Sequence, residues 1–216
     1  MRRLYLVILL ALLCGLTTGT SRAQTTRTGI DRMYVLECGH GVAPDQGRFL
    51  PGFNDGKPFD LVDNCYLIHH SRGYLLWGTG VSDKFFGKSG GVPSLGGRPN
   101  WTRKDTLSRQ LDMLGLKPSD ILYIGLSNSH IDHIGNLEMF AKTHVLIQKA
   151  EWDFADSHRY EGTPNEARFN TDHPVTKLEG DFDIFGDGSA RLIATPSVSL
   201  AVEPAKGSEG PIKRKR

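Results

Sequence analysis

The segment at residues 121–136 constrains the fold more than any other part of the chain. It opens with the short apolar run ILYIGLS, which predicts a buried β-strand. The following residues, NSHIDHIGN, place His130, Asp132 and His133 at the spacing of a metal-binding loop. The Asp-His pair comes where the chain is expected to turn into a helix, so its side chains point into the same cavity as His130 from another angle. The spacing therefore predicts a metal site between a strand and a helix.

The order of the expected elements indicates the fold class. Antiparallel strands come first, and strands that alternate with helices follow, which is typical of a layered α/β (α+β) domain. The expected strands are 32–39, 61–70, 73–80, 121–127 and 143–148. Helices are expected over 105–120, with Asp105 as the cap, over 134–142 and over 149–157. A hairpin with a Gly-Asp-Gly turn is expected over 180–196. The residues at 41–60, rich in Gly, Pro and Asp, predict a long loop.

The first residues predict export. Two arginines precede an apolar run from Leu4 to Leu16, and Ser21 and Ala23 are small residues that suit cleavage before Gln24. We therefore expect residues 1–23 to be a signal peptide and the mature protein to be secreted or periplasmic, without stable membrane insertion after cleavage. An uncleaved membrane anchor is the alternative.

The charge balance argues against nucleic-acid binding. Without residues 1–23, the chain has 23 basic and 24 acidic residues, and five of the basic ones lie after Ala205. An acidic body with a basic tail is not the pattern of a nucleic-acid-binding domain. Cys38 and Cys65 remain in the mature chain, and in an oxidising compartment they either pair or stay as buried free thiols.

Four segments carry a resemblance to a known family. They are, in their order along the chain, GKPFDLVDNCYLI, LLWGTG, SNSHIDHIGN and FGDGSARLIATP. The chain resembles the metallo-β-lactamase superfamily, and within it the exported N-acyl homoserine lactonase-like metallohydrolases, over about residues 34–196. The resemblance implies an αβ/βα sandwich and a hydrolase with two zinc ions whose bound hydroxide attacks the carbonyl of a small cyclic ester or amide. It implies His130, Asp132 and His133 as metal ligands, with Asp132 also acting in catalysis.

The sequence departs from the family pattern at three places. Asn128 stands where the family has a ligand histidine, and an amide oxygen is a poor partner for zinc beside imidazoles. Gly78 stands where the family has an aspartate that orients the ligands. The family motif Gly-His-Thr-Pro-Gly-His does not follow Pro196, and no histidine occurs after His173. Weak or partial metal binding is the expectation from these departures.

The change after Pro196 suggests a frameshift or a C-terminally truncated gene. On this hypothesis, residues 24–196 are an incomplete metallo-β-lactamase-like domain in which only the N-terminal part of the sandwich is complete. Residues 197–216 are then a disordered basic tail, and one apolar face of a sheet is left uncovered. Two alternatives to a hydrolase stay open: a decayed family member without turnover, and a module that binds a small acyl ligand without hydrolysing it.

Overall fold

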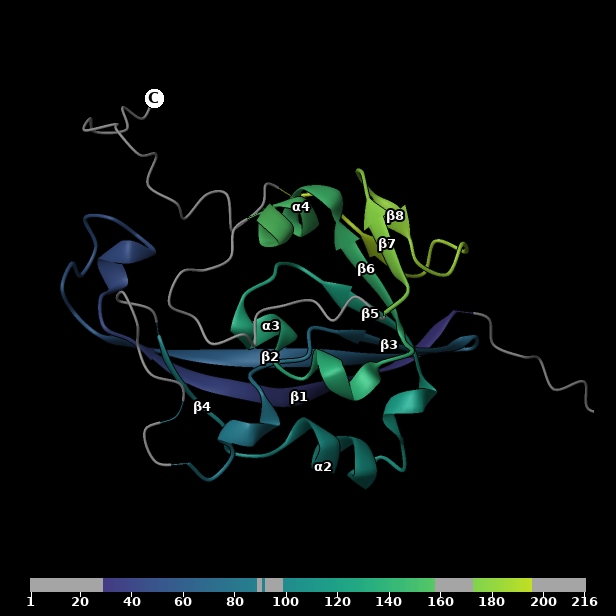
Figure 1. Ribbon diagram of the computed structural model, residues 1–216, viewed down its shortest axis with the longest axis horizontal. Helices are drawn as coiled ribbons and strands as arrows, with labels where there is room; N and C mark the ends of the chain where they lie inside the picture. The colour runs from purple at the N-terminus through teal and green to yellow at the C-terminus, as the bar shows by residue number, and fades with distance from the viewer. Residues whose placement is uncertain (1–28, 89–90, 92–98, 158–172, 196–216) are drawn as a thin grey trace, which may run out of the picture.

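The computed structural model describes residues 29–88, 91, 99–157 and 173–195 (Figure 1). The expected signal peptide and the expected basic tail lie outside the described residues. The strands are β1 (Ile30–Ala43), β2 (Phe59–His70), β3 (Gly73–Trp77), β4 (Asn100–Thr102), β5 (Ile121–Leu126), β6 (His144–Gln148), β7 (Val175–Leu178), β8 (Phe182–Asp183) and β9 (Arg191–Leu192). The helices are α2 (Leu107–Met113), α3 (Ile131–Ile134) and α4 (Lys149–Ser157), and the 3-10 turns are η1 (Gln46–Arg48), η2 (Asp83–Phe85), η3 (Pro118–Asp120) and η4 (Leu137–Phe140).

Seven of the described strands form one mixed sheet in the order β4-β1-β2-β3-β5-β6-β7. β4, β1, β2 and β3 are joined by antiparallel pairing, whereas β3, β5, β6 and β7 run parallel to one another. This division confirms the predicted order of antiparallel strands first and strand-helix units afterwards. It also brings the carboxyl ends of β3, β5 and β6 to the same edge of the sheet.

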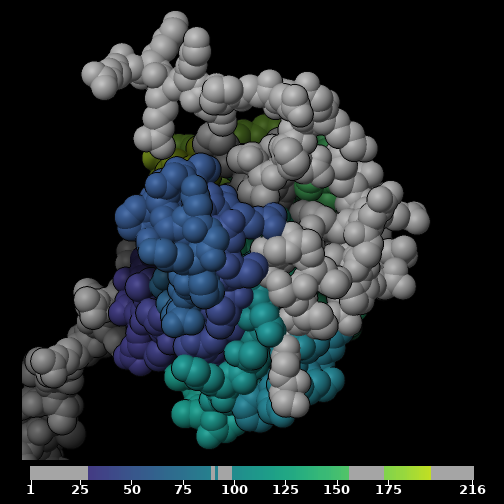
Figure 2. Space-filling model, turned by 90° about the vertical axis from the view of Figure 1, so that its left-hand side faces the viewer, coloured from purple at the N-terminus to yellow at the C-terminus, as the bar shows by residue number. Residues whose placement is uncertain are grey.

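The first strand is longer than the sequence predicted. It continues to Ala43, which lies opposite Phe59 at the start of β2. The predicted loop at 41–60 is therefore wrong at both ends, because long-range pairing holds those residues in the ladder. The connection that remains between β1 and β2 includes η1 and projects from the end of the molecule shown in Figure 2.

Apolar side chains on the two faces of the sheet form two cores. Leu76 belongs to the core that packs against α2 and α3, together with Leu107 and Ile134. Its neighbour Leu75 points to the opposite face and belongs to the core under the β8–β9 hairpin, with Phe185. The alternation along β3 thus gives the sheet an apolar core on each face, in a layered α/β domain as predicted.

Two helix predictions need correction. Helix α2 is capped by Thr106, whose hydroxyl accepts the N–H of Arg109 at 3.1 Å, and not by Asp105. The helix expected over 134–142 is broken into α3 and η4 at Gly135. A Cβ at Gly135 would lie 2.3 Å from the backbone nitrogen of Ser82, so tertiary packing sets this break.

Part of the second face carries no cover among the described residues. Met33, Val35 and Val62 on β1 and β2 are 57%, 57% and 61% exposed. No helix in the described part of the chain is long and apolar enough to cross a membrane.

A candidate metal loop at the carboxyl ends of the parallel strands

The loop that carries the predicted ligands leaves β5 at the edge where the parallel strands end. The backbone N–H of Gly78, just past β3, donates to the carbonyl of Gly125 at 2.9 Å. Thr79 donates its N–H and its hydroxyl to the carbonyl of His133, at 2.7 and 2.9 Å. The end of β3 therefore holds the far side of the loop, at the position where open α/β sheets bind ligands.

The structure brings the three predicted ligands into one short stretch. His130 is the N-cap residue of α3, and Asp132 and His133 lie in its single turn. The Asp132 and His133 side chains are 18% and 29% exposed, and the Asp132 Oδ2 lies 3.5 Å from the His133 Nε2. Both groups face solvent in part, as groups that meet a ligand must.

Asn128, which occupies the family's histidine position, is used inside the loop. It is only 4% exposed. Its Oδ1 accepts the backbone N–H of His130 at 2.9 Å, and its Nδ2 donates to the Ser127 hydroxyl at 3.1 Å. This is the side-chain-to-backbone turn that asparagine commonly makes. The amide oxygen is therefore already bonded to a donor that shapes the loop.

Glu151 supports the loop from α4, and no sequence pattern pointed to it. It lies in the first turn of α4 and is 1% exposed. One of its carboxylate oxygens accepts both the N–H and the hydroxyl of Ser129, at 2.9 and 2.8 Å. Ser129 is itself fully buried. A buried carboxylate bonded to two donors of one loop residue fixes that residue in place.

Asp63 is a second buried carboxyl that the sequence did not point to. It lies on β2, is 8% exposed, and its Oδ2 has no hydrogen-bond partner among the described residues. Burial, and then the charge of Asp132, raise the pKa of Asp63 to about 8. Gly78, where the family has aspartate, has a φ of 74° and brings no carboxylate of its own. Asp63, on β2, is thus a buried carboxyl group whose pKa is raised in part by the charge of Asp132.

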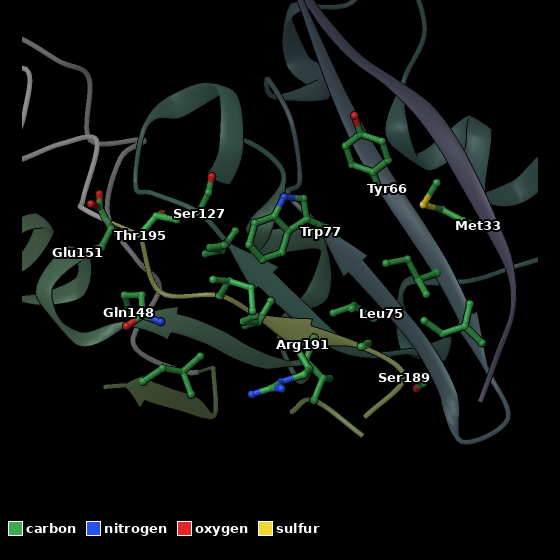
Figure 3. Close-up of a pocket in the computed structure, with 18 of the residues that line it drawn as sticks. Met33, Tyr66, Leu75, Trp77, Ser127, Gln148, Glu151, Ser189, Arg191 and Thr195 are labelled. Carbon is green, nitrogen blue, oxygen red and sulfur yellow. The ribbon is translucent and has the colours of Figure 1, made fainter. Parts of the chain in front are cut away.

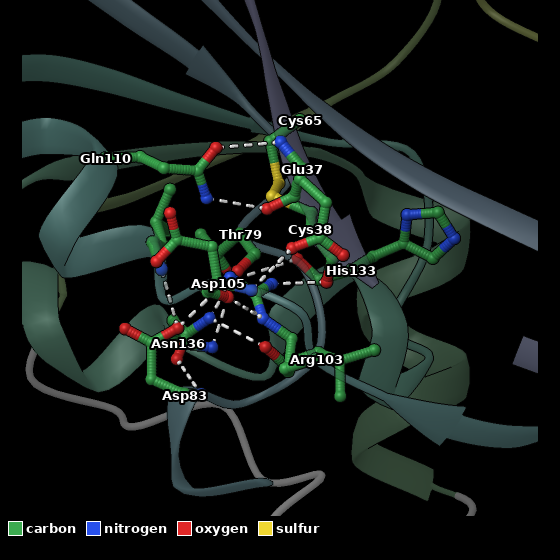
Figure 4. The surroundings of a disulfide bond; sticks show 12 residues. Glu37, Cys38, Cys65, Thr79, Asp83, Arg103, Asp105, Gln110, His133 and Asn136 are labelled. Carbon is green, nitrogen blue, oxygen red and sulfur yellow. Dashed lines mark hydrogen bonds and ion pairs between the residues drawn. A yellow bond between two sulfur atoms is a disulfide. The ribbon is translucent and has the colours of Figure 1, made fainter. Parts of the chain in front are cut away.

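A disulfide joins Cys38 and Cys65 beneath this region, which decides between the two alternatives left open by the sequence (Figure 4). Arg103 lies beside it and donates to the carbonyl of Cys38, while its Nη2 lies 3.2 Å from the Asp83 Oδ1. Burial lowers the pKa of Arg103, and the charge of Asp83 opposes that shift. The disulfide and the buried ion pair fix β1, β2 and η2 around the loop.

The described residues do not complete a metal site. No group of three His, Cys, Asp or Glu side chains in the described ranges is arranged to hold an ion. The Asn128 Oδ1 accepts the His130 N–H, and an amide oxygen is a poor ligand for zinc beside imidazoles. A catalytic zinc normally has at least three protein ligands. His130, Asp132 and His133 share one loop, but by themselves they do not fit the two-ion centre that the resemblance implied.

Comparisons with known proteins agree with this fold. Residues 59–201 match the metallo-β-lactamase superfamily. An N-acyl homoserine lactonase of Bacillus sp is 29% identical over 192 residues, which cover 85% of this chain and 74% of the relative. An N-acyl homoserine lactonase of Bacillus cereus is 30% identical over 177 residues, which cover 79% of this chain and 67% of the relative.

One solved structure extends the comparison to three dimensions. It is an N-acyl homoserine lactone hydrolase with the product N-hexanoyl-L-homoserine bound at its catalytic metal center. The two structures superpose with a TM-score of 0.60 at 25% sequence identity, over 73% of this chain. The chain spans 63% of the length of that solved protein.

Proposed function

The chain belongs to the metallo-β-lactamase superfamily, and from this premise we propose that its function is the hydrolysis of a lactone, the cyclic ester of an acylated small molecule. One observation carries the proposal. The loop with His130, Asp132 and His133 lies at the carboxyl ends of parallel strands, in a fold shared with an N-acyl homoserine lactone hydrolase. A lactone of this kind is therefore the substrate class to test first.

The residues of this chain have distinct parts in the proposal. Asp132 is a partly exposed carboxylate at the loop, and it is the group we assign to accept a proton from the attacking water. His133 lies beside it, with its Nε2 3.5 Å from the Asp132 Oδ2. Glu151 and Thr79 keep the loop in shape from its two sides.

Zinc enters only as a proposal. The relatives' activity implies a metal, but the described residues do not form a complete ligand set, so we derive no step through an ion. We propose that His130, Asp132 and His133 are the residues that meet zinc in this chain, weakly or with partial occupancy. Asn128 is not assigned to this set, since its oxygen accepts the His130 N–H and an amide is a poor zinc ligand.

The test is lactone opening by the purified chain. Proton release from N-hexanoyl and N-decanoyl homoserine lactone is measured with and without added zinc. We expect ring opening above the spontaneous rate, and a loss of about a hundredfold or more in Asp132→Asn. Glu138→Gln, at an exposed position of η4, is the control and keeps the wild-type rate. A rate equal to the spontaneous one at every zinc concentration contradicts the proposal.

A second function is favoured by the state of Asn128. Both the oxygen and the nitrogen of its side-chain amide are hydrogen-bonded within the loop. The chain is therefore also a candidate for a family member that binds an acylated ligand without hydrolysing it. A ligand-dependent rise in melting temperature without turnover identifies this case. If the ligand neither raises the melting temperature nor is turned over, the chain is a decayed family member.

We also propose that residues 1–23 are removed on export and that the mature protein works in an oxidising, periplasmic or extracellular compartment. The buried Cys38–Cys65 disulfide supports this, since such bonds persist where thiols are not kept reduced. Mass spectrometry of the mature N-terminus in a secreting host tests it. A start at Gln24 agrees with the proposal, and a retained Met1 contradicts it.

A further inference from the structure

The outer side of β1 is a free sheet edge over most of its length. On its inner side, β1 pairs with β2 from Ile30 to Ala43. On its outer side, the pairing with β4 covers residues 40–42. Within the described ranges, no strand lies beside the rest of that outer side. An exposed edge of this kind offers its backbone N–H and C=O groups to a strand of another chain.

Two hydrogen bonds of Gln110 show which backbone groups of β1 face outward. Its side-chain amide donates to the C=O of Glu37 at 2.8 Å and accepts the N–H of Glu37 at 2.9 Å (Figure 4). Because the direction of the backbone groups alternates along a strand, Val35 and Met33 also turn theirs away from β2. The described part of the chain supplies no hydrogen-bond partner for these N–H and C=O groups.

Two features limit the free edge to a short regular segment. A register shift just before Arg32 interrupts the pairing with β2 at one end. At the other end, Gln110 occupies the backbone groups of Glu37. The residues between, 32–36, read RMYVL, with no proline and no acidic side chain. Tyr34 is the middle residue, so two such segments pair over their whole length when one Tyr34 lies opposite the other.

We propose that this edge, residues 32–36, binds a second copy of the chain, with the two β1 strands antiparallel about a twofold axis beside Tyr34. Met33 of one copy then lies opposite Val35 of the other, and the two residues exchange both of their backbone hydrogen bonds. The twofold axis produces the same pair again, so the contact is closed and self-complementary. The two sheets become one continuous sheet, and the free backbone groups of both copies are satisfied.

The apolar side chains of the segment suit this pairing. Met33 and Val35 are each 57% exposed. Figure 3 shows Met33 beyond Trp77 and Tyr66, on the side of the sheet where β1 runs. Across the axis, Met33 and Val35 of one copy meet Val35 and Met33 of the other on the same face. The pairing therefore removes apolar surface from water as well as satisfying the backbone.

Charged side chains favour the antiparallel orientation. Arg32 of one copy comes opposite Leu36 of the other, and so next to Glu37. The Glu37 side chain is 23% exposed, and its Oε1 has no hydrogen-bond partner among the described residues. The guanidinium of the other copy is a charged donor for this oxygen. A parallel pair would instead bring Arg32 beside Arg32. Just beyond the segment, Asp31 comes opposite Glu37, and these like charges end the ladder there.

Sedimentation velocity of the full chain over a concentration series tests the association. Two paired segments of this length bury less area than a standard interface, so we expect a Kd on the order of 10–100 µM. Val35→Lys places two ammonium groups diagonally across the axis and is expected to raise the Kd about fivefold or more. Val62→Lys is the matched control, at a 61% exposed position on β2, and is expected to keep the wild-type Kd.

A cysteine at the axis tests the register. Opposite residues of a non-hydrogen-bonded antiparallel pair have Cα atoms ~4.5 Å apart, within the reach of a disulfide. Tyr34→Cys, in a Cys14→Ser background, is therefore expected to form a covalent dimer under mild oxidation. Arg32→Cys in the same background is the control. It is more exposed than Tyr34, but four residues along the strand, roughly 13 Å, separate it from its counterpart, so it stays monomeric.

Three results overturn the proposal. One is a chain that stays monomeric up to roughly 500 µM, well above the expected Kd. Another is a covalent dimer that forms as readily in Arg32→Cys as in Tyr34→Cys, since random collision then explains both. The third is a dimer whose Kd is the same in Val35→Lys and in Val62→Lys, which places the contact on another surface.

Discussion

The N–H and the hydroxyl of Ser129 both donate to one carboxylate oxygen of Glu151, at 2.9 and 2.8 Å. Both residues are buried, so this contact decides the path of the loop between Asn128 and His130. On the other side of the loop, the carbonyl of His133 accepts both donors of Thr79. The loop is therefore held by the protein alone, whether or not an ion is bound.

Removing the Glu151 carboxylate leaves two buried donors of Ser129 without their acceptor. We expect Glu151→Ala to lower the free energy of unfolding by about 2–4 kcal/mol. Glu151→Gln keeps an acceptor oxygen and is expected to cost less than about 1.5 kcal/mol. Urea unfolding gives both values, with exposed Glu138→Ala as the control. A Glu151→Ala protein as stable as that control would show that the contact does not hold the loop.

The Cys38–Cys65 disulfide closes a loop with a sequence separation of 27. A crosslink of that size stabilises the native state by about 3 kcal/mol, because it lowers the conformational entropy of the unfolded chain. The double variant Cys38→Ala, Cys65→Ala is expected to lose that amount in urea unfolding. Dithiothreitol should destabilise the wild-type protein and leave the double variant unchanged. Equal stability of the oxidised protein and the double variant would argue against this contribution.

Asp63 predicts a pH dependence of stability in metal-free protein. Its pKa is about 8 in the folded state and near 3.8 when unfolded, so the folded state holds an extra proton between these values. The stability that this proton contributes is full below about pH 4 and is lost as pH rises through about 8. Asp63→Asn removes the effect, because its amide never ionises.

The stability of Asp63→Asn relative to wild type is therefore expected to grow with pH between 4 and 8, by at most about 1.4 kcal/mol per pH unit. Urea unfolding in chelator at several pH values measures this difference. Asp60→Asn, an exposed position on the same strand, should follow the wild-type curve. A constant difference between Asp63→Asn and wild type would mean that Asp63 does not titrate in this range.

Local sequence patterns predicted the parts of the fold that depend on local structure. The apolar run of β5, the alternation of Leu75 and Leu76, and the ligand spacing from His130 to His133 are all visible in the sequence. The length of β1 and the break at Gly135 depend on partners far along the chain. Contacts between residues far apart in the chain cannot be read from local sequence patterns.

The same limit applies to the site. Asn128 was recognised as a departure, but its bond to the His130 N–H is a matter of local geometry that the structure had to supply. Glu151 and Asp63 look like ordinary surface acids in the sequence, since burial of a carboxylate depends on the packing around it. The charge coupling between Asp63 and Asp132 follows from the approach of β2 to α3.

Asn128 shapes the loop and leaves it short of ligands. Zinc bound per chain, measured by equilibrium dialysis and elemental mass spectrometry, tests this most directly. We predict at most one weakly held zinc in the wild-type protein, an unchanged value in Asn128→Ser, and tighter binding in Asn128→His, which adds an imidazole two residues before His130. Two tightly held zinc ions in the wild-type chain would contradict the account.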